Sequence, residues 1–375
     1  MRIIFHHPAP LNPAATSASG IRPLKMLKAF EKIGYQVDRI TGYASERKEC
    51  INYIKKNISN GIKYEFMYSE STTWPTYMPS KRSLTLNLGF DFGFFKYLVI
   101  HDVPIGLFYR DIYWLFPELT GKIPFLKTCI AKYLFWYDLR QYQKCLKILY
   151  LPSVEMAKYI PLVDQRICRA LPPGHDFNKN IIVKSPTDNR CINILYVGGL
   201  GQHYQMHKLF DVLTHCRNIS FTLCTRMTEW ESARQDYPNP LPPNINIVHK
   251  SGSELGDLYK QADIASIFVR PEAYREFAAP FKLYEYLGMG KPVIASKGTL
   301  AGKFIEENNI GWCIPYEERA LDELLKNLIQ NHHLIVEKAS VCDRVRDYHS
   351  WATRAEQVVK ELSAEDRRER GLFNG

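Results

Sequence analysis

The feature that most constrains this chain is an alternation of short apolar strand patterns and amphipathic helix patterns, which begins anew in the second half. The first series opens with a strand pattern at residues 1–5, a loop that ends at Gly20, and a helix pattern over 21–33. Gly34 ends that helix, and residues 35–40 have the pattern of the next strand. Strand, helix and strand in this order predict a right-handed βαβ unit, with both strands in one parallel sheet.

The second series begins after a short segment rich in proline. Residues 171–174 read LPPG, in which two prolines stiffen the chain and a glycine lets it turn. A strand pattern at 192–197 follows, and a glycine-rich loop at 198–201 leads into the next helix. The other expected elements are helices at 48–58, 122–142, 154–160, 206–213, 254–261, 300–308, 319–331 and 333–363, and strands at 64–68, 147–151, 221–224, 244–248, 264–269, 293–295 and 311–314.

These patterns predict an α/β fold of two Rossmann-like domains that face each other across a cleft. The first domain is expected over residues 1–171 and the second over 175–351, with a helix at about 352–370 packing back on the first. Ligands of open α/β sheets bind in such crevices, and closure about 171–174 would exclude water from the site. No GxGxxG motif is present, which argues against a dinucleotide-binding dehydrogenase.

Length and composition agree with two globular domains and argue against several classes of protein. The chain has 375 residues, of which 46% are hydrophobic and 23% are charged. Its nine cysteines are scattered without a CxxC pair, which argues against a disulfide framework and a zinc site and favours a reducing compartment. No signal-peptide pattern and no apolar run of about 18 residues is present. We therefore expect a cytoplasmic protein.

Positive charge is concentrated in the first half. Residues 1–175 carry 24 Lys and Arg against 13 Asp and Glu, whereas residues 176–375 carry 25 against 26. Sixteen aromatic residues lie between Phe90 and Tyr142, interleaved with lysines and arginines. One interpretation is a large aromatic core with ordinary surface cations; the other is a peripheral surface for the anionic inner face of the cell membrane. Nucleic-acid binding fits the basic balance too, but the sequence contains no recognised nucleic-acid module.

Residues 276–296 (EFAAPFKLYEYLGMGKPVIAS) contain the clearest local chemistry of the chain. Pro280 stands where a helix begins, in a first turn that tolerates its fixed φ and missing N–H. Lys282 and Glu285 follow one turn apart, before glycines that end the helix and a new strand. The free N–H groups and positive dipole end of a first helical turn suit an anion. This stretch therefore predicts a nucleotide-phosphate site.

Four motifs stand in the second half of the chain. In chain order they are LYVGGL at 195–200, SEL through YKQADI at 253–264, PFKLYEYL with GKPVIAS at 280–296, and GW at 311–312 with SW at 350–351. The four motifs span residues 195–351. They resemble the motifs of bacterial glycosyltransferases with two Rossmann-like domains, the GT-B fold, and are most similar to family 4 and its capsule, exopolysaccharide and O-antigen relatives.

The resemblance implies an enzyme that moves a sugar from a nucleoside-diphosphate sugar to a carbohydrate or polyprenyl-diphosphate-linked glycan acceptor in surface polysaccharide synthesis. It also implies retention of anomeric configuration, and no obligatory cofactor or metal. Catalysis would rest on positioning and on stabilising the leaving diphosphate.

The same resemblance assigns donor-binding roles within the helix that Pro280 opens. Glu285 would accept hydrogen bonds from the ribose hydroxyls, and Lys282 with the amides of Phe281 and Lys282 would bind the diphosphate. The first glutamate of the family's Glu-x7-Glu pattern falls at Phe277, and Glu276 stands one residue before it. Glu276 is retained as a candidate donor contact, and the identity of the donor sugar stays open.

Five further positions are candidates for the donor site or its surroundings. Gly198 and Gly199, with Gly201, would let phosphate or acceptor approach the backbone. Arg226 follows a strand and would pair with a phosphate, and Lys250 follows the strand whose exit flanks the base. For the two cations, an ordinary surface role is the alternative.

On the acceptor side, Arg110 and Asp111 follow a strand of the first domain. Asp111 would act as a base or orient the acceptor hydroxyl, and Arg110 would bind acceptor phosphate; a structural ion pair is the alternative. Gly20 and Ile21, at the start of the first helix, would admit an acceptor diphosphate. Two other functions stay open: a nucleoside-diphosphate-sugar 2-epimerase, and a catalytically silent nucleotide-binding scaffold of a polysaccharide complex.

Overall fold

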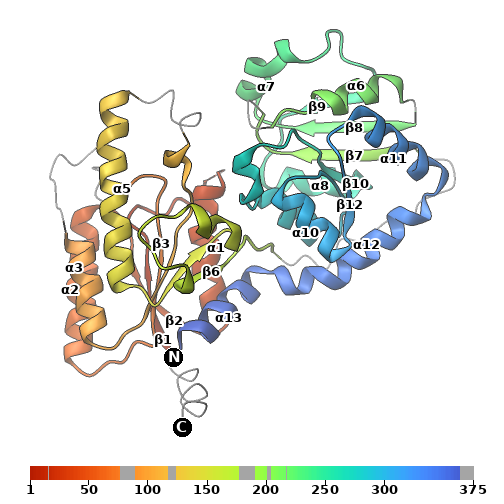
Figure 1. Cartoon of the computed structure of the whole chain (residues 1–375). Coiled ribbons are helices and arrows are strands. Elements are labelled where there is room, and N and C mark those ends of the chain that lie inside the picture. Colours follow the sequence, from red (N-terminus) through yellow and green to blue (C-terminus); the bar gives the residue numbers. More distant parts are fainter. Residues whose placement is uncertain are drawn as a thin grey trace. The chain divides into compact units, whose positions relative to one another are not determined.

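The computed structural model describes residues 1–15, 17–76, 89–116, 124–176, 191–200, 204–216 and 218–363. The chain forms two compact units. The first consists of Met1–Pro172 together with Trp351–Gly375, and the second is Pro173–Ser350. Figure 1 shows the end of the chain returning to the first unit through its last helix.

The first unit is built on a parallel six-stranded sheet in the order β2-β1-β3-β4-β5-β6. Its strands are β1 (Arg2–His6), β2 (Gln36–Ile40), β3 (Met67–Glu70), β4 (Ile105–Phe108), β5 (Ile148–Leu151) and β6 (Cys168–Ala170). Its helices are α1 (Ala18–Lys32), α2 (Ala44–Ser59), α3 (Phe90–Ile100), α5 (Phe125–Cys145) and α13 (Trp351–Leu362), with short 3₁₀ turns η1 (Tyr113–Leu115), η2 (Val154–Tyr159) and η3 (Gln165–Ile167).

Helices α1 and α13 pack together on this sheet. Apolar residues at helical spacing on α1 are buried, and the ring of Phe30 lies 5.3 Å from that of Tyr68 in β3. On α13, Leu362 approaches β4 so closely that a Cβ added at Gly106 would lie 2.6 Å from its Cδ1. The last helix is therefore part of the core of the first unit.

The second unit repeats the architecture with the parallel order β12-β11-β10-β7-β8-β9. Its strands are β7 (Ile192–Val197), β8 (Ile219–Cys224), β9 (Ile245–Val248), β10 (Ile264–Ile267), β11 (Val293–Ser296) and β12 (Gly311–Ile314). Its helices are α6 (His207–His215), α7 (Met227–Ala233), α8 (Leu255–Gln261), α9 (Phe281–Gly288), α10 (Leu300–Asn308), α11 (Glu318–Gln330) and α12 (His333–Val345), with 3₁₀ turns η4 (Arg234–Asp236), η5 (Gly252–Glu254), η6 (Ala273–Glu276) and η7 (Arg346–His349).

Both sheets change their winding direction at an interior pair of strands. In the first unit this pair is β1 and β3, and in the second it is β7 and β10. Ligands of doubly wound sheets bind beyond the carboxyl ends of the strands at such a switch point. The predicted α/β class with two parallel sheets is confirmed, and the switch points tell where each unit's site is to be sought.

Two of the differences from the predicted bounds come from tertiary contacts. The strand expected at 64–68 is β3, which begins three residues later and ends two later, because its end includes the polar pair Ser69 and Glu70, both buried. The single helix expected at 333–363 is three elements, α12, η7 and α13, because Ser350 is extended with a ψ of 162° and bridges to His175. Both errors come from tertiary contacts that override the local pattern.

Helix α5 buries a carboxyl group against the core. The side chain of Asp138 is 2% exposed and accepts a hydrogen bond of 2.7 Å from the amide of Thr76. Burial raises the pKa of Asp138 to about 7, although the Thr76 hydrogen bonds act in the opposite direction. The folded protein therefore holds this proton over a pH range in which the unfolded chain has already released it.

We predict that Asp138 makes the first unit less stable as the pH rises. A carboxyl whose folded-state pKa is raised contributes stability that is lost between its unfolded pKa, about 4, and its folded pKa. Asp138→Asn keeps an acceptor for Thr76 and removes the titration. Relative to the unsubstituted protein, the variant should gain about 2 kcal/mol in free energy of unfolding between pH 5 and pH 8, measured by chemical denaturation. Asp102→Asn, at an exposed position of the same unit, is the control; parallel pH profiles for all three proteins would contradict the prediction.

Candidate functional site

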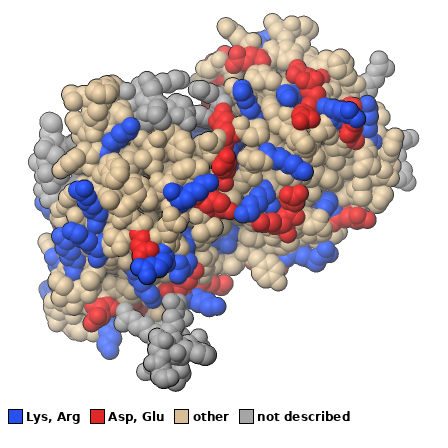
Figure 2. Space-filling model, in the orientation of Figure 1, with Lys and Arg blue, Asp and Glu red and all other residues tan. Residues whose placement is uncertain are grey.

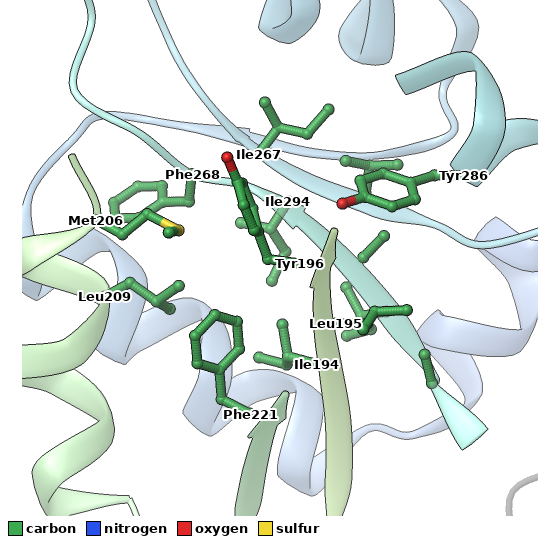
Figure 3. Packing of buried hydrophobic residues seen from close by; sticks show 14 of the residues in the cluster. Ile194, Leu195, Tyr196, Met206, Leu209, Phe221, Ile267, Phe268, Tyr286 and Ile294 are labelled. Carbon is green, nitrogen blue, oxygen red and sulfur yellow. The ribbon is translucent and has the colours of Figure 1, made fainter. Parts of the chain in front are cut away.

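The candidate site of the second unit lies at the carboxyl end of β7, where helix α9 is fixed to the strand. The hydroxyl of Tyr286 in α9 accepts a hydrogen bond of 2.7 Å from the amide of Val197 and lies 3.4 Å from its carbonyl oxygen. Figure 3 shows the ring of Tyr196 above Ile194 and Phe221 with its hydroxyl pointing away from both, and the ring of Tyr286 to one side. The polar ends of these two rings therefore reach the edge of the core where the strand stops.

Helix α9 begins one residue later than the local sequence predicted. Pro280 has extended backbone angles (φ −74°, ψ 133°) and precedes Phe281, the first helical residue. The carbonyl of Pro280 accepts the amide of Leu283 at 3.2 Å, which closes the first turn. Lys282 and Glu285 both lie on α9, three residues apart, and so share a face.

Lys282 is buried between aromatic rings rather than exposed on the helix. Its side chain is 7% exposed, and its ammonium donates a hydrogen bond to the hydroxyl of Tyr196. The ammonium nitrogen lies 3.9 Å from the ring centroids of both Tyr196 and Tyr204. Gly198 (φ +148°) passes so close that an added Cβ would lie 2.6 Å from Lys282 Nζ. The backbone angle favours glycine, and any side chain at this position would also have to displace the ammonium of Lys282.

The charge of Lys282 lies in an unfavourable environment. Burial lowers the pKa of Lys282 well below its ordinary value, and the charge of Arg275 lowers it further. The carboxylates of Glu285 and Glu229 act in the opposite direction. An added negative group near this nitrogen would raise its pKa and stabilise the ammonium.

The loop after β7 is bound to helix α7 through a carboxylate. Gly199 accepts a hydrogen bond of 2.7 Å from the hydroxyl of Tyr196, and the amide of Leu200 donates to Glu229 Oε2 at 3.0 Å. Arg226 makes an ion pair of 2.8 Å with the other oxygen of Glu229, and 57% of its side chain is exposed. Arg226 therefore helps to hold the loop while keeping an exposed guanidinium.

The other predicted donor-site residues are less enclosed. Glu285 is half-buried, Lys250 is exposed just after β9, and Glu276 is exposed at the end of η6. Phe277 is 2% exposed and its ring packs 5.1 Å from that of Tyr274, so this position belongs to the interior. Gly201 lies outside the described residues.

At the switch point of the first unit, Glu70 is held between two arginines. Its side chain is wholly buried at the end of β3, with Arg22 Nε at 3.3 Å and Arg110 Nη2 at 3.8 Å. Tyr68 donates a hydrogen bond of 2.8 Å to it. Burial raises the pKa of Glu70, and both arginines act to lower it. Asp111, beside Arg110, accepts the amide of Tyr113 at 2.9 Å.

Gly20 and Ile21 lie inside α1, not at its start. The helix begins at Ala18, and the amides of Gly20 and Ile21 both donate to the carbonyl of Ser17 at 3.0 Å. An added Cβ at Gly20 would lie 2.5 Å from that of Ala15, so the glycine lets the preceding loop approach the helix. The expectation that Gly20 ends the loop is wrong by three residues.

Among the residues that build these two sites, sequence reasoning missed Tyr196, Tyr204, Glu229, Arg275, Tyr286, Glu70 and Arg22. Tyr196 was counted as part of an apolar strand, and Glu70 lay beyond the predicted end of β3. A glutamate immediately after a strand was the one available signal for Glu70, because the carboxyl ends of parallel strands carry ligand sites. Arg275 had no such signal, since it lies in a short 3₁₀ turn.

The chain resembles known proteins in sequence over part of its length and in fold over nearly all of it. Residues 207–360 match the family model described as "Glycosyl transferase-like". That match covers less than half of the chain, and the fold of the chain is the GT-B fold of the solved glycosyltransferases described below. No curated protein matches the sequence.

Three solved structures illustrate the likeness of fold. HepE of Anabaena, in complex with UDP and glucose, is 13% identical with a TM-score of 0.60, and the match covers 96% of this chain and 99% of HepE. WaaG, a glycosyltransferase of lipopolysaccharide biosynthesis, is 14% identical with a TM-score of 0.56, covering 96% and 100%. A glycosyltransferase from Rickettsia africae is 13% identical with a TM-score of 0.59, covering 96% and 98%.

We predict that Gly198→Ala destabilises the second unit. The positive φ disfavours any side chain, and the added Cβ would displace the ammonium of Lys282. The loss should be about 1–3 kcal/mol in free energy of unfolding, measured by chemical denaturation. Gly256→Ala, in α8 with no atom within 4 Å of the added Cβ, is the control and should be neutral or slightly stabilising. Equal stability of the two variants would show that the contact with Lys282 is not a constraint.

Proposed function

We propose that this protein is a glycosyltransferase that moves a sugar from a nucleoside-diphosphate sugar to a glycan acceptor, and that the donor diphosphate binds at Lys282. The observation that supports this most is the ammonium of Lys282, buried against the bare backbone of Gly198 at the switch point of its sheet. Such a place admits a phosphate group, because glycine leaves the backbone accessible and the start of α9 favours negative charge.

The donor contacts divide between the two ends of the nucleotide. Glu285, half-buried on the same face of α9 as Lys282, would accept hydrogen bonds from the ribose hydroxyls. Gly199 and the exposed guanidinium of Arg226 would face the phosphates, and Lys250 the base. We take a UDP-sugar as the first donor to test, because HepE is described in complex with UDP and with UDP-glucose.

Catalysis in this proposal stabilises the leaving group. As the bond from the sugar to the diphosphate breaks, negative charge grows on the diphosphate oxygens. A protonated Lys282 and the amino end of α9 would lower the energy of that charge in a site with little water. We propose that the sugar keeps its anomeric configuration, as the family resemblance implies.

The first unit supplies the acceptor contacts in this proposal. Arg110 is held by Glu70 and Ser71, whose carbonyl oxygen lies 3.3 Å from Arg110 Nε, and would bind an acceptor phosphate. Asp111 would orient the acceptor hydroxyl, and Gly20 and Ile21 would lie along the acceptor's path. A polyprenyl-diphosphate-linked glycan of bacterial surface polysaccharide synthesis fits these contacts, because it offers both phosphate and hydroxyl groups.

In this proposal, helix α5 forms the surface that faces the membrane. Exposed fractions of 84% for Phe125, 71% for Leu126 and 71% for Tyr133 mark an apolar face opposite the side that packs on the core. Arg140 is also exposed on α5, and Figure 2 shows Lys and Arg predominating over Asp and Glu on this face of the first unit. No helix among the described residues is long and apolar enough to cross a membrane. We therefore propose peripheral binding of α5 to anionic lipid on the inner face of the cell membrane.

The role of Glu285 is tested by nucleotide binding. Glu285→Ala should weaken binding of the donor nucleotide by about 1–3 kcal/mol, as expected for hydrogen bonds to a charged group. The affinity is measured by calorimetry after a thermal-shift screen of UDP-, GDP-, ADP- and CDP-sugars. Asp257→Ala removes an exposed carboxylate from α8 in the same unit and should leave the affinity unchanged. Equal affinities for both variants and the unsubstituted protein would remove Glu285 from the donor site.

The reaction itself is tested with the donor that the screen selects. Incubation with a radiolabelled donor and a bacterial membrane extract should label glycolipid. Release of the free 2-epimer would identify an epimerase instead. Nucleotide binding without either product would identify a catalytically silent scaffold. This alternative is tested because position 277 is a phenylalanine rather than a glutamate.

The membrane surface is tested by co-sedimentation with liposomes. The protein should bind vesicles that contain anionic lipid, and less so as salt is raised, because the charge contribution is screened. Leu126→Ser with Tyr133→Ser should abolish binding. The matched control is Tyr53→Ser with Ile100→Ser, which removes two exposed apolar residues from α2 and α3 of the same unit. Equal loss in both pairs, or equal binding to neutral vesicles, would contradict the assignment to α5.

A further inference from the structure

Two buried cations share one tyrosine ring beside the loop after β7. The guanidinium carbon of Arg275, in η6, lies 4.2 Å from the ring centroid of Tyr204, and Lys282 Nζ lies 3.9 Å from the same centroid. Arg275 is 8% exposed and Lys282 is 7% exposed. The charge of Arg275 acts on Lys282 strongly enough to lower its pKa. The two groups therefore form one local concentration of positive charge.

This charge has no bonded carboxylate in the part of the chain that the structure describes. Arg275 Nε is buried and finds no hydrogen-bond partner among those residues. Glu229 and Glu285 act on Lys282 only at longer range, since neither makes an ion pair with it among the described residues. Cations taken out of water are ordinarily paired, because their desolvation is costly. Aromatic rings compensate part of that cost, and an anion would compensate the rest.

We propose that Arg275 is a second ligand of the donor diphosphate and that, with Lys282, it binds the two phosphates around Tyr204. The inference rests on the proposed function, since it assumes that the diphosphate binds at Lys282. It assigns a role to a residue that the sequence motifs do not mark. Phe277 lies in the core, so the segment before α9 supplies the guanidinium of Arg275 to this site instead of a carboxylate.

Arginine suits this position better than lysine would. Its flat guanidinium can lie against the ring of Tyr204 and still present N–H groups at its edge, which match phosphate oxygens in pairs. Tyr204 would keep both cations in place before the donor arrives. Binding of the diphosphate then does not have to order two long side chains, and the affinity is higher for that reason.

The test compares a nucleoside diphosphate with its monophosphate. Calorimetry of the unsubstituted protein with UDP, GDP, ADP and CDP selects the tightest diphosphate, which is then compared with the monophosphate of the same base. Arg275→Gln should weaken diphosphate binding by about tenfold or more and monophosphate binding by much less, so that the ratio of the two affinities falls. Arg275→Lys should restore part of the ratio. Arg270→Gln removes an exposed arginine near the same site and should leave the ratio unchanged.

A second readout separates a ligand from a structural residue. Without the charge of Arg275, the pKa of Lys282 rises, so the pH above which diphosphate affinity falls should move upward in Arg275→Gln. An unchanged affinity ratio and pH profile, or equal loss of diphosphate and monophosphate with a lowered melting temperature, would overturn the role of Arg275 while leaving the donor site in place. If the unsubstituted protein binds none of the four diphosphates, the proposed function fails, and this inference fails with it.

Discussion

The burial of one ammonium group is the constraint on which the site of the second unit depends. Lys282 extends from the first turn of α9 into the space between the end of β7 and the following loop. That space exists because Gly198 has no side chain, and Tyr286 holds the helix at the strand by bonding to Val197. A side chain at position 198 would occupy that space and displace the ammonium.

The first unit also buries a charged group at its switch point, but this group is a carboxylate and it is paired within the protein. Its switch point buries the carboxylate of Glu70 with Arg22 and Arg110 on either oxygen, so each of these arginines has a carboxylate beside it inside the protein. In the second unit, Lys282 and Arg275 face aromatic rings instead of a carboxylate. Two sheets of the same topology therefore differ in their electrostatics. In the first, a carboxylate holds the two arginines in place. In the second, a bound anion would stabilise Lys282 and Arg275.

Much of this arrangement follows from local sequence, and the remainder depends on contacts that no local pattern encodes. The strand periodicity, the glycines after β7 and the helix of Lys282 and Glu285 are recognisable because each is determined by neighbours in the chain. Arg275 and Tyr204 meet Lys282 only through folding. The break in the helix predicted at 333–363 could not be recognised for a related reason. The extended conformation of Ser350 depends on its bridge to His175, which forms only on folding.

The return of α13 to the first unit makes the second unit an insertion within the first. Residues 173–350 are contiguous, so every strand and helix of the second unit is available once residue 350 has left the ribosome. The first unit is different, because Leu362 fills the space that Gly106 leaves on β4. During synthesis, the domain that begins the chain is therefore the last to complete its core.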